Sequence, residues 1–186
     1  MRVGILGGTF DPPHIGHLLL AADAIDALAL ERVVYVPTGV QPLKIGEVIA
    51  SPGERLAMTE LLVGDAAALT VDPIEIDRPG LSFTVDTLRE MGRRSPGDAR
   101  VLLLGADAAR TIARWREPEE VSRLAEVVVL CRGEESAPPG FRTVSSRRVD
   151  VSSTEVRARV RAGRSIRGFV PDAVREYIAR TGLYRG

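Results

Sequence analysis

The order of apolar runs and helical segments constrains this chain more than any other feature. Short runs of aliphatic and β-branched residues recur at 2–6, 33–36, 69–76, 101–104 and 127–131, and residues 142–149 are a candidate for a sixth, short strand. Segments with helical spacing separate them. Strands joined through helices lie parallel and are connected by right-handed crossovers. The pattern therefore predicts an α/β fold with a doubly wound, mainly parallel sheet of five to six strands and flanking helices.

The expected helices cover 18–28, 51–62, 83–91, 153–162, 171–180 and a stretch from 106 to 125 that breaks near Pro118. The second of these begins with a strong signal, Ser51 as N-cap, proline at the first helical position and Glu54 at the third. No repeat, low-complexity tract or linker interrupts the series. We therefore expect residues 1–186 to form a single domain, with the helical segment 153–186 packed on it.

Composition excludes several classes of protein. Lysine plus arginine number 25, equal to aspartate plus glutamate, which argues against a protein that coats nucleic acid. No apolar stretch reaches the length of about 18 residues that a membrane span needs. The single cysteine, Cys131, excludes an intrachain disulfide, and the N-terminus lacks the apolar region of a signal peptide. We expect a cytoplasmic protein, and the sequence leaves a homo-oligomer open.

The stretch GGTFDPPHIGH, residues 7–17, lies between the first expected strand and the first helix. Gly7 and Gly8 would let backbone N–H groups approach a phosphate, and the helix N-terminus adds its dipole. Thr9 could add a hydroxyl donor. Neither G-x-x-x-x-G-K-[ST] nor G-x-G-x-x-G is present, so the glycines do not identify a nucleotide site without further evidence.

Both histidines of the chain, His14 and His17, fall in this stretch. Their spacing places the two rings on one face at the start of a helix, directed toward the carboxyl end of the sheet. No HExxH pattern or neighbouring cysteine indicates a metal site. The pair indicates ligand binding, and protonated rings could stabilise charge on a phosphoryl oxygen.

A second polar stretch, VSSTEVR at residues 151–157, precedes an expected helix. Ser152 and Glu155 fit a capping box, which many ordinary helices have. The hydroxyls and first N–H groups also suit an anion, and Arg157 lies one turn further on, where it could clamp a phosphate. The arginines that follow, at 159–167, are interpreted as a solvated face that attracts ATP rather than as a nucleic-acid arm.

Taken as units, these stretches carry a family resemblance. GGTFDPPHIGH resembles the signature of the HxGH nucleotidyltransferases, and most closely that of the bacterial nicotinate-nucleotide adenylyltransferases, GGTFDPxHxGH. Residues 151–157 resemble the second motif of the same superfamily, [IV]SSTxxR. Between them, residues 82–88 resemble SYTxDTL with Phe83 in place of tyrosine, and residues 104–107 resemble the family's GAD stretch. The resemblance covers nearly the whole chain.

The resemblance implies a Rossmann-like fold and the transfer of AMP from ATP to nicotinate mononucleotide, which yields deamido-NAD and pyrophosphate. It implies catalytic roles for His14, His17 and Arg157. The residues implied in ATP binding are Gly7, Gly8, Thr9, Phe10, Gly105, Asp107, Ser152, Ser153 and Thr154. Those implied in binding the nicotinate nucleotide are Thr84, Trp115 and Lys44. Mg²⁺ would enter with ATP, held mainly by phosphate oxygens rather than by protein ligands.

Some positions leave alternatives open. Many family members have Pro-His-Lys where this chain has Pro42-Leu43-Lys44, so a solvated surface lysine fits Lys44 equally well. Trp115 could simply be a packing residue. The loop at 40–50 is a candidate lid. The alternative functions are phosphopantetheine adenylyltransferase, nicotinamide mononucleotide adenylyltransferase, and a non-catalytic nucleotide-binding regulatory module.

Overall fold

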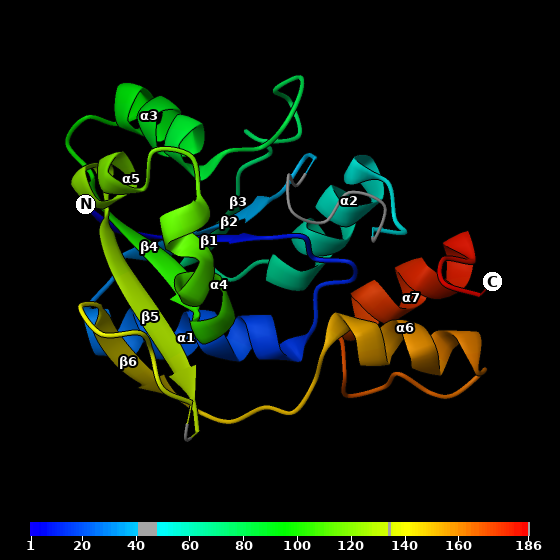
Figure 1. Ribbon diagram of the computed structural model, residues 1–186. Helices are drawn as coiled ribbons and strands as arrows, with labels where there is room; N and C mark the ends of the chain where they lie inside the picture. The colour runs from blue at the N-terminus through cyan, green and yellow to red at the C-terminus, as the bar shows by residue number, and fades with distance from the viewer. Residues whose placement is uncertain (41–47, 134, 186) are drawn as a thin grey trace.

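The computed structural model describes residues 1–40, 48–133 and 135–185. Its described strands form one six-stranded sheet in the order β3-β2-β1-β4-β5-β6, and every neighbouring pair is parallel (Figure 1). The strands are β1 (Arg2–Gly8), β2 (Arg32–Pro37), β3 (Leu69–Val71), β4 (Ala99–Gly105), β5 (Glu126–Arg132) and β6 (Arg142–Ser146). The predicted doubly wound α/β fold is confirmed.

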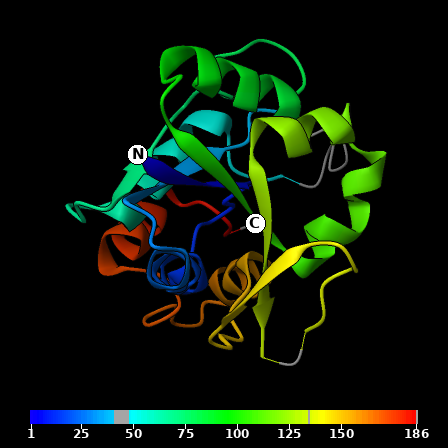
Figure 2. The same ribbon diagram turned by 90° about the vertical axis from the view of Figure 1, so that its left-hand side faces the viewer.

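Helices cover both faces of this sheet. They are α1 (Ile15–Leu28), α2 (Pro52–Val63), α3 (Thr84–Arg94), α4 (Ala106–Thr111), the 3₁₀ turn η1 (Ile112–Arg114), α5 (Pro118–Leu124), α6 (Ser153–Arg161) and α7 (Asp172–Thr181). Figures 1 and 2 show α1, α6 and α7 below the sheet and α3 and α5 above it. Among the described helices, none has the length and apolarity needed to cross a membrane.

The strands are apolar along their whole length because each contributes to two cores. In β2, Val33 and Tyr35 join the core shared with α1, α2, α6 and α7. Val34 and Val36 face the opposite way, into the core under α3 and α5. Successive side chains of a strand point to opposite faces, so a sheet covered on both sides needs continuous apolar runs.

The third strand is shorter than predicted. The apolar run suggested 69–76, but β3 ends at Val71. The Asp72 carboxylate accepts the N–H of Ile74 at 3.0 Å, and the carbonyl of Pro73 accepts the N–H of Ile76 at 2.7 Å. These turn hydrogen bonds replace a ladder that Pro73 could not continue, because proline has no N–H.

Helix α2 begins as predicted but buries an unexpected face. The Ser51 hydroxyl accepts the N–H of Glu54, and the Glu54 carboxylate accepts the N–H of Ser51 at 2.7 Å, which completes the capping box. Arg55 and Met58 are fully buried, whereas Leu61 is only partly so. The interior of the protein therefore contains a guanidinium group that the apolar pattern did not indicate.

The sheet has its topological switch point between β1 and β4. Strand β1 pairs with β2 on one side and with β4 on the other. Ligands of doubly wound sheets bind outside the carboxyl ends of the strands at such a point. The two glycine-containing strand ends, Gly7–Gly8 on β1 and Gly105 on β4, both lie there.

Candidate active site

The turn after β1 is shaped by a buried aromatic ring. Phe10 has a φ of 51° and is only 3% exposed, and its ring contacts those of His17 and Tyr35. A Cβ on Gly8 would lie 2.8 Å from this ring, so glycine is required there. The Phe10 ring belongs to the core, which leaves only its backbone for the predicted contact with ATP.

The two histidines stack on each other at the start of α1. Their ring centroids lie 3.8 Å apart with an interplanar angle of 29°. The N–H of His14, the N-cap, donates to Nδ1 of His17 at 3.0 Å, so a neutral His17 carries its proton on Nε2. A Cβ on Gly16 would lie 3.0 Å from two atoms of the His14 ring. Glycine between the histidines therefore leaves room for the stack.

The surroundings of the two rings disfavour their protonated forms when no anion is bound. Burial, together with the positive charge of Arg132, lowers the pKa of His14 to about 4. Burial also lowers the pKa of His17 well below its usual value, with contributions from His14 and Arg132. Without a bound anion, both imidazoles are neutral at pH 7. His17 then acts as a neutral hydrogen-bond donor through Nε2–H.

This arrangement predicts a pH dependence of stability. The pKa of His14 is near 4 in the folded protein and near 6.5 when unfolded, so the unfolded chain binds more protons between these values. Stability is therefore fully present above pH 6.5 and falls as the pH drops toward 4. We expect urea titrations to lose about 1–2 kcal/mol from this group between pH 7 and pH 5.

The control is His14→Gln, which cannot titrate. Groups remote from residue 14 contribute equally to both proteins, so the difference between wild type and variant reports on His14 and its coupling to His17. The free energies of unfolding of the two should converge as the pH falls from 7 to 5. A difference that stays constant over this range would contradict the assignment.

The second motif packs directly against the first. Ser152 caps α6 as predicted, its hydroxyl accepting the N–H of Glu155 at 3.1 Å. The Ser153 hydroxyl donates to the carbonyl of Pro12 at 2.8 Å, and Nη1 of Arg157 donates to the carbonyl of Asp11 at 2.7 Å. The N-terminus of α6 thus lies beside the histidine turn, and the structure brings the two motifs together.

The exposed hydroxyl of Thr154 lies on the first turn of α6, where it accepts a hydrogen bond from Nη2 of Arg157 at 3.4 Å. Gly105 ends β4 and caps α4. The Asp107 carboxylate is fully exposed and pairs with Arg110 at 2.6 Å. These groups line the same edge of the sheet as the turn, which is where the sequence placed them.

The residues expected to bind the acceptor lie at the start of α3 and at the end of η1. Thr84 begins α3, and the Trp115 ring packs with Phe83 against the core under α3 and α5. The indole N–H donates to the Thr111 hydroxyl at 3.2 Å. Trp115 therefore has a packing role whatever it binds. Lys44 and most of the candidate lid at 40–50 lie outside the described residues.

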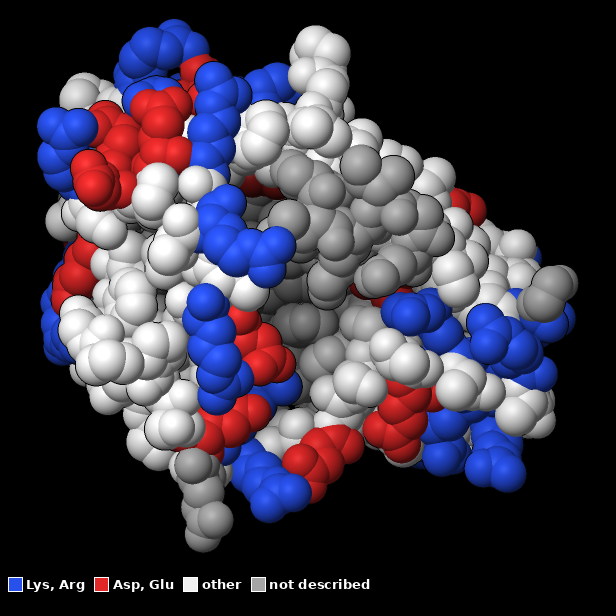
Figure 3. All heavy atoms as spheres, viewed as in Figure 1, with Lys and Arg blue, Asp and Glu red and all other residues white. Residues whose placement is uncertain are grey.

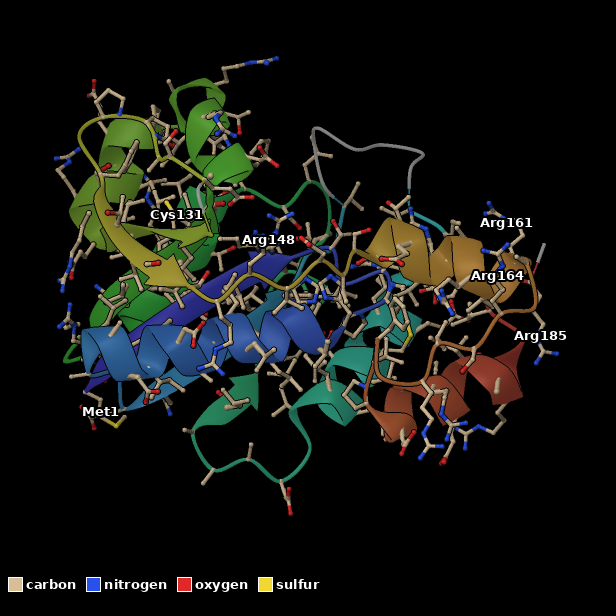
Figure 4. All side chains as sticks on the ribbon, turned by 90° about the horizontal axis from the view of Figure 1, so that it is seen from below. Met1, Cys131, Arg148, Arg161, Arg164 and Arg185 are labelled. Atoms are coloured by element: carbon tan, nitrogen blue, oxygen red, sulfur yellow. The ribbon has the colours of Figure 1, made fainter. Side chains whose placement is uncertain are left out.

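A cavity of about 480 Å³ opens beside the N-terminus of α6. Its lining residues are Arg132, Glu135, Arg148, Val149, Asp150, Val151, Ser152 and Glu155. Figure 4 shows Arg148 on the segment that leads into α6. No motif in the sequence points to Arg132, the last residue of β5. Its position could nevertheless have been predicted, because Arg132 ends a parallel strand at the same edge of the sheet as Gly8 and Gly105.

The predicted solvated basic face also has a place in the structure. Residues 153–185 contain eight arginines and three carboxylates. Positive side chains gather over the α6–α7 end in Figure 3, and Figure 4 shows Arg161, Arg164 and Arg185 projecting there. Arg159 instead braces the following loop, with Nε donating to the carbonyl of Ser165 at 2.7 Å.

Comparison with known proteins adds independent evidence. The family model described as "Cytidylyltransferase-like" matches residues 5–159. A "Probable nicotinate-nucleotide adenylyltransferase" of Gemmatimonas aurantiaca is 46% identical, aligned over 100% of this chain and 93% of its own. A protein of the same name from Thermus thermophilus is 43% identical over the full length of both chains.

The fold is shared with a more distant solved structure. This is the nicotinic acid mononucleotide adenylyltransferase of Plasmodium falciparum complexed with NaAD, which matches with a TM-score of 0.81 at 19% identity over 98% of this chain and 97% of that one. The matched model and the full-length identity agree with the two converging motifs. The chain belongs to the cytidylyltransferase-like family and, within it, to the nicotinate-nucleotide adenylyltransferases.

Proposed function

We propose that this protein is a cytoplasmic adenylyltransferase that transfers AMP from ATP to nicotinate mononucleotide. A phosphate oxygen of the mononucleotide attacks the α-phosphorus of ATP. The bond from that phosphorus to the oxygen bridging to the β-phosphorus breaks, and pyrophosphate leaves with that oxygen. The products are deamido-NAD and pyrophosphate, and no covalent enzyme intermediate is needed.

One observation carries this proposal. The histidine turn and the start of α6 are joined by the hydrogen bonds from Ser153 to Pro12 and from Arg157 to Asp11, although they are far apart in the chain. The contact concentrates imidazole N–H, guanidinium and helix N-terminal N–H groups at the switch point of the sheet. All of these are donors to phosphate oxygens.

The chemistry follows from positioning and charge neutralisation. Two anionic substrates repel each other, so the protein gains most by holding them in line and by stabilising charge that develops on the transferring group. In this proposal His17 donates through Nε2–H, and an approaching phosphate opposes the effect of burial on the pKa of both histidines. Arg157 and the first N–H groups of α6 hold the triphosphate.

Mg²⁺ would supply additional charge neutralisation on the triphosphate. Among the described residues there is no group of three or more His, Cys, Asp or Glu side chains suited to a metal ion. The donors at the turn are nitrogen groups, which bind phosphate oxygens rather than Mg²⁺. These residues therefore fit an ion that enters coordinated to ATP.

The start of α3 is suited to the acceptor. Phe83 caps this helix without a side-chain hydrogen bond, and the N–H of Asp86 donates to the Phe83 carbonyl. Within the part of the chain that the structure describes, this leaves the N–H groups of Thr84 and Val85 available to an anion. A nicotinate carboxylate would benefit from the helix dipole, whereas a neutral amide would gain much less. The Trp115 indole supplies a flat surface for the pyridine ring. Lys44 is retained as a proposed contact with the nucleotide phosphate.

The decisive experiment is a pyrophosphate-release assay with ATP and Mg²⁺. Nicotinate mononucleotide, nicotinamide mononucleotide and phosphopantetheine are offered in turn as acceptors. We expect rapid release with the nicotinate nucleotide and release at least about tenfold slower with the amide, since the carboxylate contact is lost. The His17→Ala variant serves as the blank, because release that originates at this site must fall with it.

Each alternative has its own outcome. Release with phosphopantetheine only would overturn the nicotinate assignment. Faster release with the amide would reverse the proposed specificity. Release with none of the three, together with calorimetric binding of ATP, would favour a regulatory module that binds nucleotide without catalysis.

A further inference from the structure

The Asp11 carboxylate lies at a junction of three chain segments beneath the histidine turn. It is 3% exposed. Oδ2 accepts the N–H of Ile49 at 2.8 Å, and Oδ1 accepts the N–H of Ala50 at 3.1 Å. The Tyr184 hydroxyl donates to Oδ1 at 2.7 Å from 173 positions along the chain. A buried carboxylate held by three donors has little freedom to move.

Tyr184 is built into the interior rather than trailing on the surface. It follows α7, has a φ of 66° and is 4% exposed, and its side chain joins the same core as Phe10. Burial and the hydrogen bond to Asp11 both raise the pKa of its hydroxyl. Tyr184 therefore stays protonated at neutral pH and donates to Asp11.

The backbone of the same turn is held by residues of the site. The carbonyl of Asp11 accepts a hydrogen bond from Nη1 of Arg157. The carbonyl of the next residue, Pro12, accepts one from the Ser153 hydroxyl. Arg55 provides a third hydrogen bond to this turn, because its Nη1 donates to the carbonyl of Thr9 at 2.8 Å. A shift of the Asp11 side chain would consequently move the carbonyls that orient Arg157 and Ser153.

We propose that Tyr184 is a positioning residue for nucleotidyl transfer, acting through Asp11 to fix the turn that carries the histidines and orients Arg157. This inference rests on the proposed function. Transfer depends on alignment to within about half an ångström, so a small displacement lowers turnover more than substrate binding. Tyr184 does not itself touch the substrates.

The test is Tyr184→Phe, which keeps the buried ring and removes only the hydroxyl. We expect kcat to fall about tenfold, while KM for ATP and for nicotinate mononucleotide changes less than about threefold. The matched control is Tyr177→Phe, which removes the hydroxyl of a partly exposed tyrosine on α7. Its kinetic constants should equal those of the wild type.

A second measurement does not depend on catalysis. Amide hydrogen exchange, followed by mass spectrometry without substrates, should become faster in the segment 9–14 of Tyr184→Phe but not of Tyr177→Phe. Unchanged exchange in this segment, or a lowered thermal midpoint with unchanged kcat, would overturn the inference. The wild type could release no pyrophosphate with any acceptor while hydrogen exchange in Tyr184→Phe still becomes faster in segment 9–14. That result would refute the proposed function but would support the role of Tyr184 in positioning the turn.

Discussion

Replacing His17 by alanine is expected to lower kcat roughly 10²- to 10⁴-fold while the protein remains folded. The ring supplies Nε2–H, the donor assigned to the phosphoryl group, and its Nδ1 accepts the N–H of His14 at 3.0 Å. Alanine removes both interactions and the stacking partner of His14. The ring also contacts the buried Phe10, so some loss of stability accompanies the change, but the larger loss should be in kcat because the donor itself is removed.

The measurement is steady-state pyrophosphate release, with circular dichroism and urea titration to establish folding. His17→Gln is the matched comparison, because its side-chain amide can place an N–H close to the position of Nε2. We expect the glutamine variant to recover part of the lost turnover. Near-normal turnover of His17→Ala would refute the role assigned to this residue.

Replacing Arg55 by methionine is expected to destabilise the protein by about 3–5 kcal/mol. The guanidinium is 1% exposed and donates to the carbonyls of Thr9 and Gly39, at 2.8 and 3.0 Å. Methionine fills a similar volume but leaves both carbonyls unsatisfied. It also removes the positive charge that attracts the buried Asp11 carboxylate.

Urea titration of the wild type and of Arg55→Met measures this loss directly. Arg55→Lys keeps the charge but cannot donate to two carbonyls from a planar fork, so its stability should fall between the two. Arg161→Met, a change of the same kind at an exposed site on α6, should stay within about 0.5 kcal/mol of the wild type. A loss below about 1 kcal/mol for Arg55→Met would show that the buried guanidinium is dispensable.

Much of this architecture could be predicted from the sequence because its signals are local. The alternation of apolar runs and helices predicts a parallel sheet. The geometry of such a sheet then brings together polar residues that follow different strands, even when they are as distant in sequence as His14 and Arg157. The capping of α2 by Ser51 and of α6 by Ser152 was predictable for the same reason, since each depends on neighbouring residues.

The remaining features depend on contacts that no local pattern encodes. The helical pattern of α2 gives no sign that Arg55 is buried. Its burial depends on the carbonyls of Thr9 and Gly39, which two other loops supply. The neutral state of the histidines depends on burial and on the charge of Arg132. The role of Tyr184 depends on a carboxylate 173 positions away.

The bond between Tyr184 and Asp11 also has a consequence for the order in which the protein matures. The turn is synthesised well before the groups that hold it, which belong to Ser153, Arg157 and Tyr184. A nascent chain can form β1, α1 and β2 long before this happens. In a growing chain the turn therefore gains its last hydrogen-bond partner only once residue 184 has been synthesised.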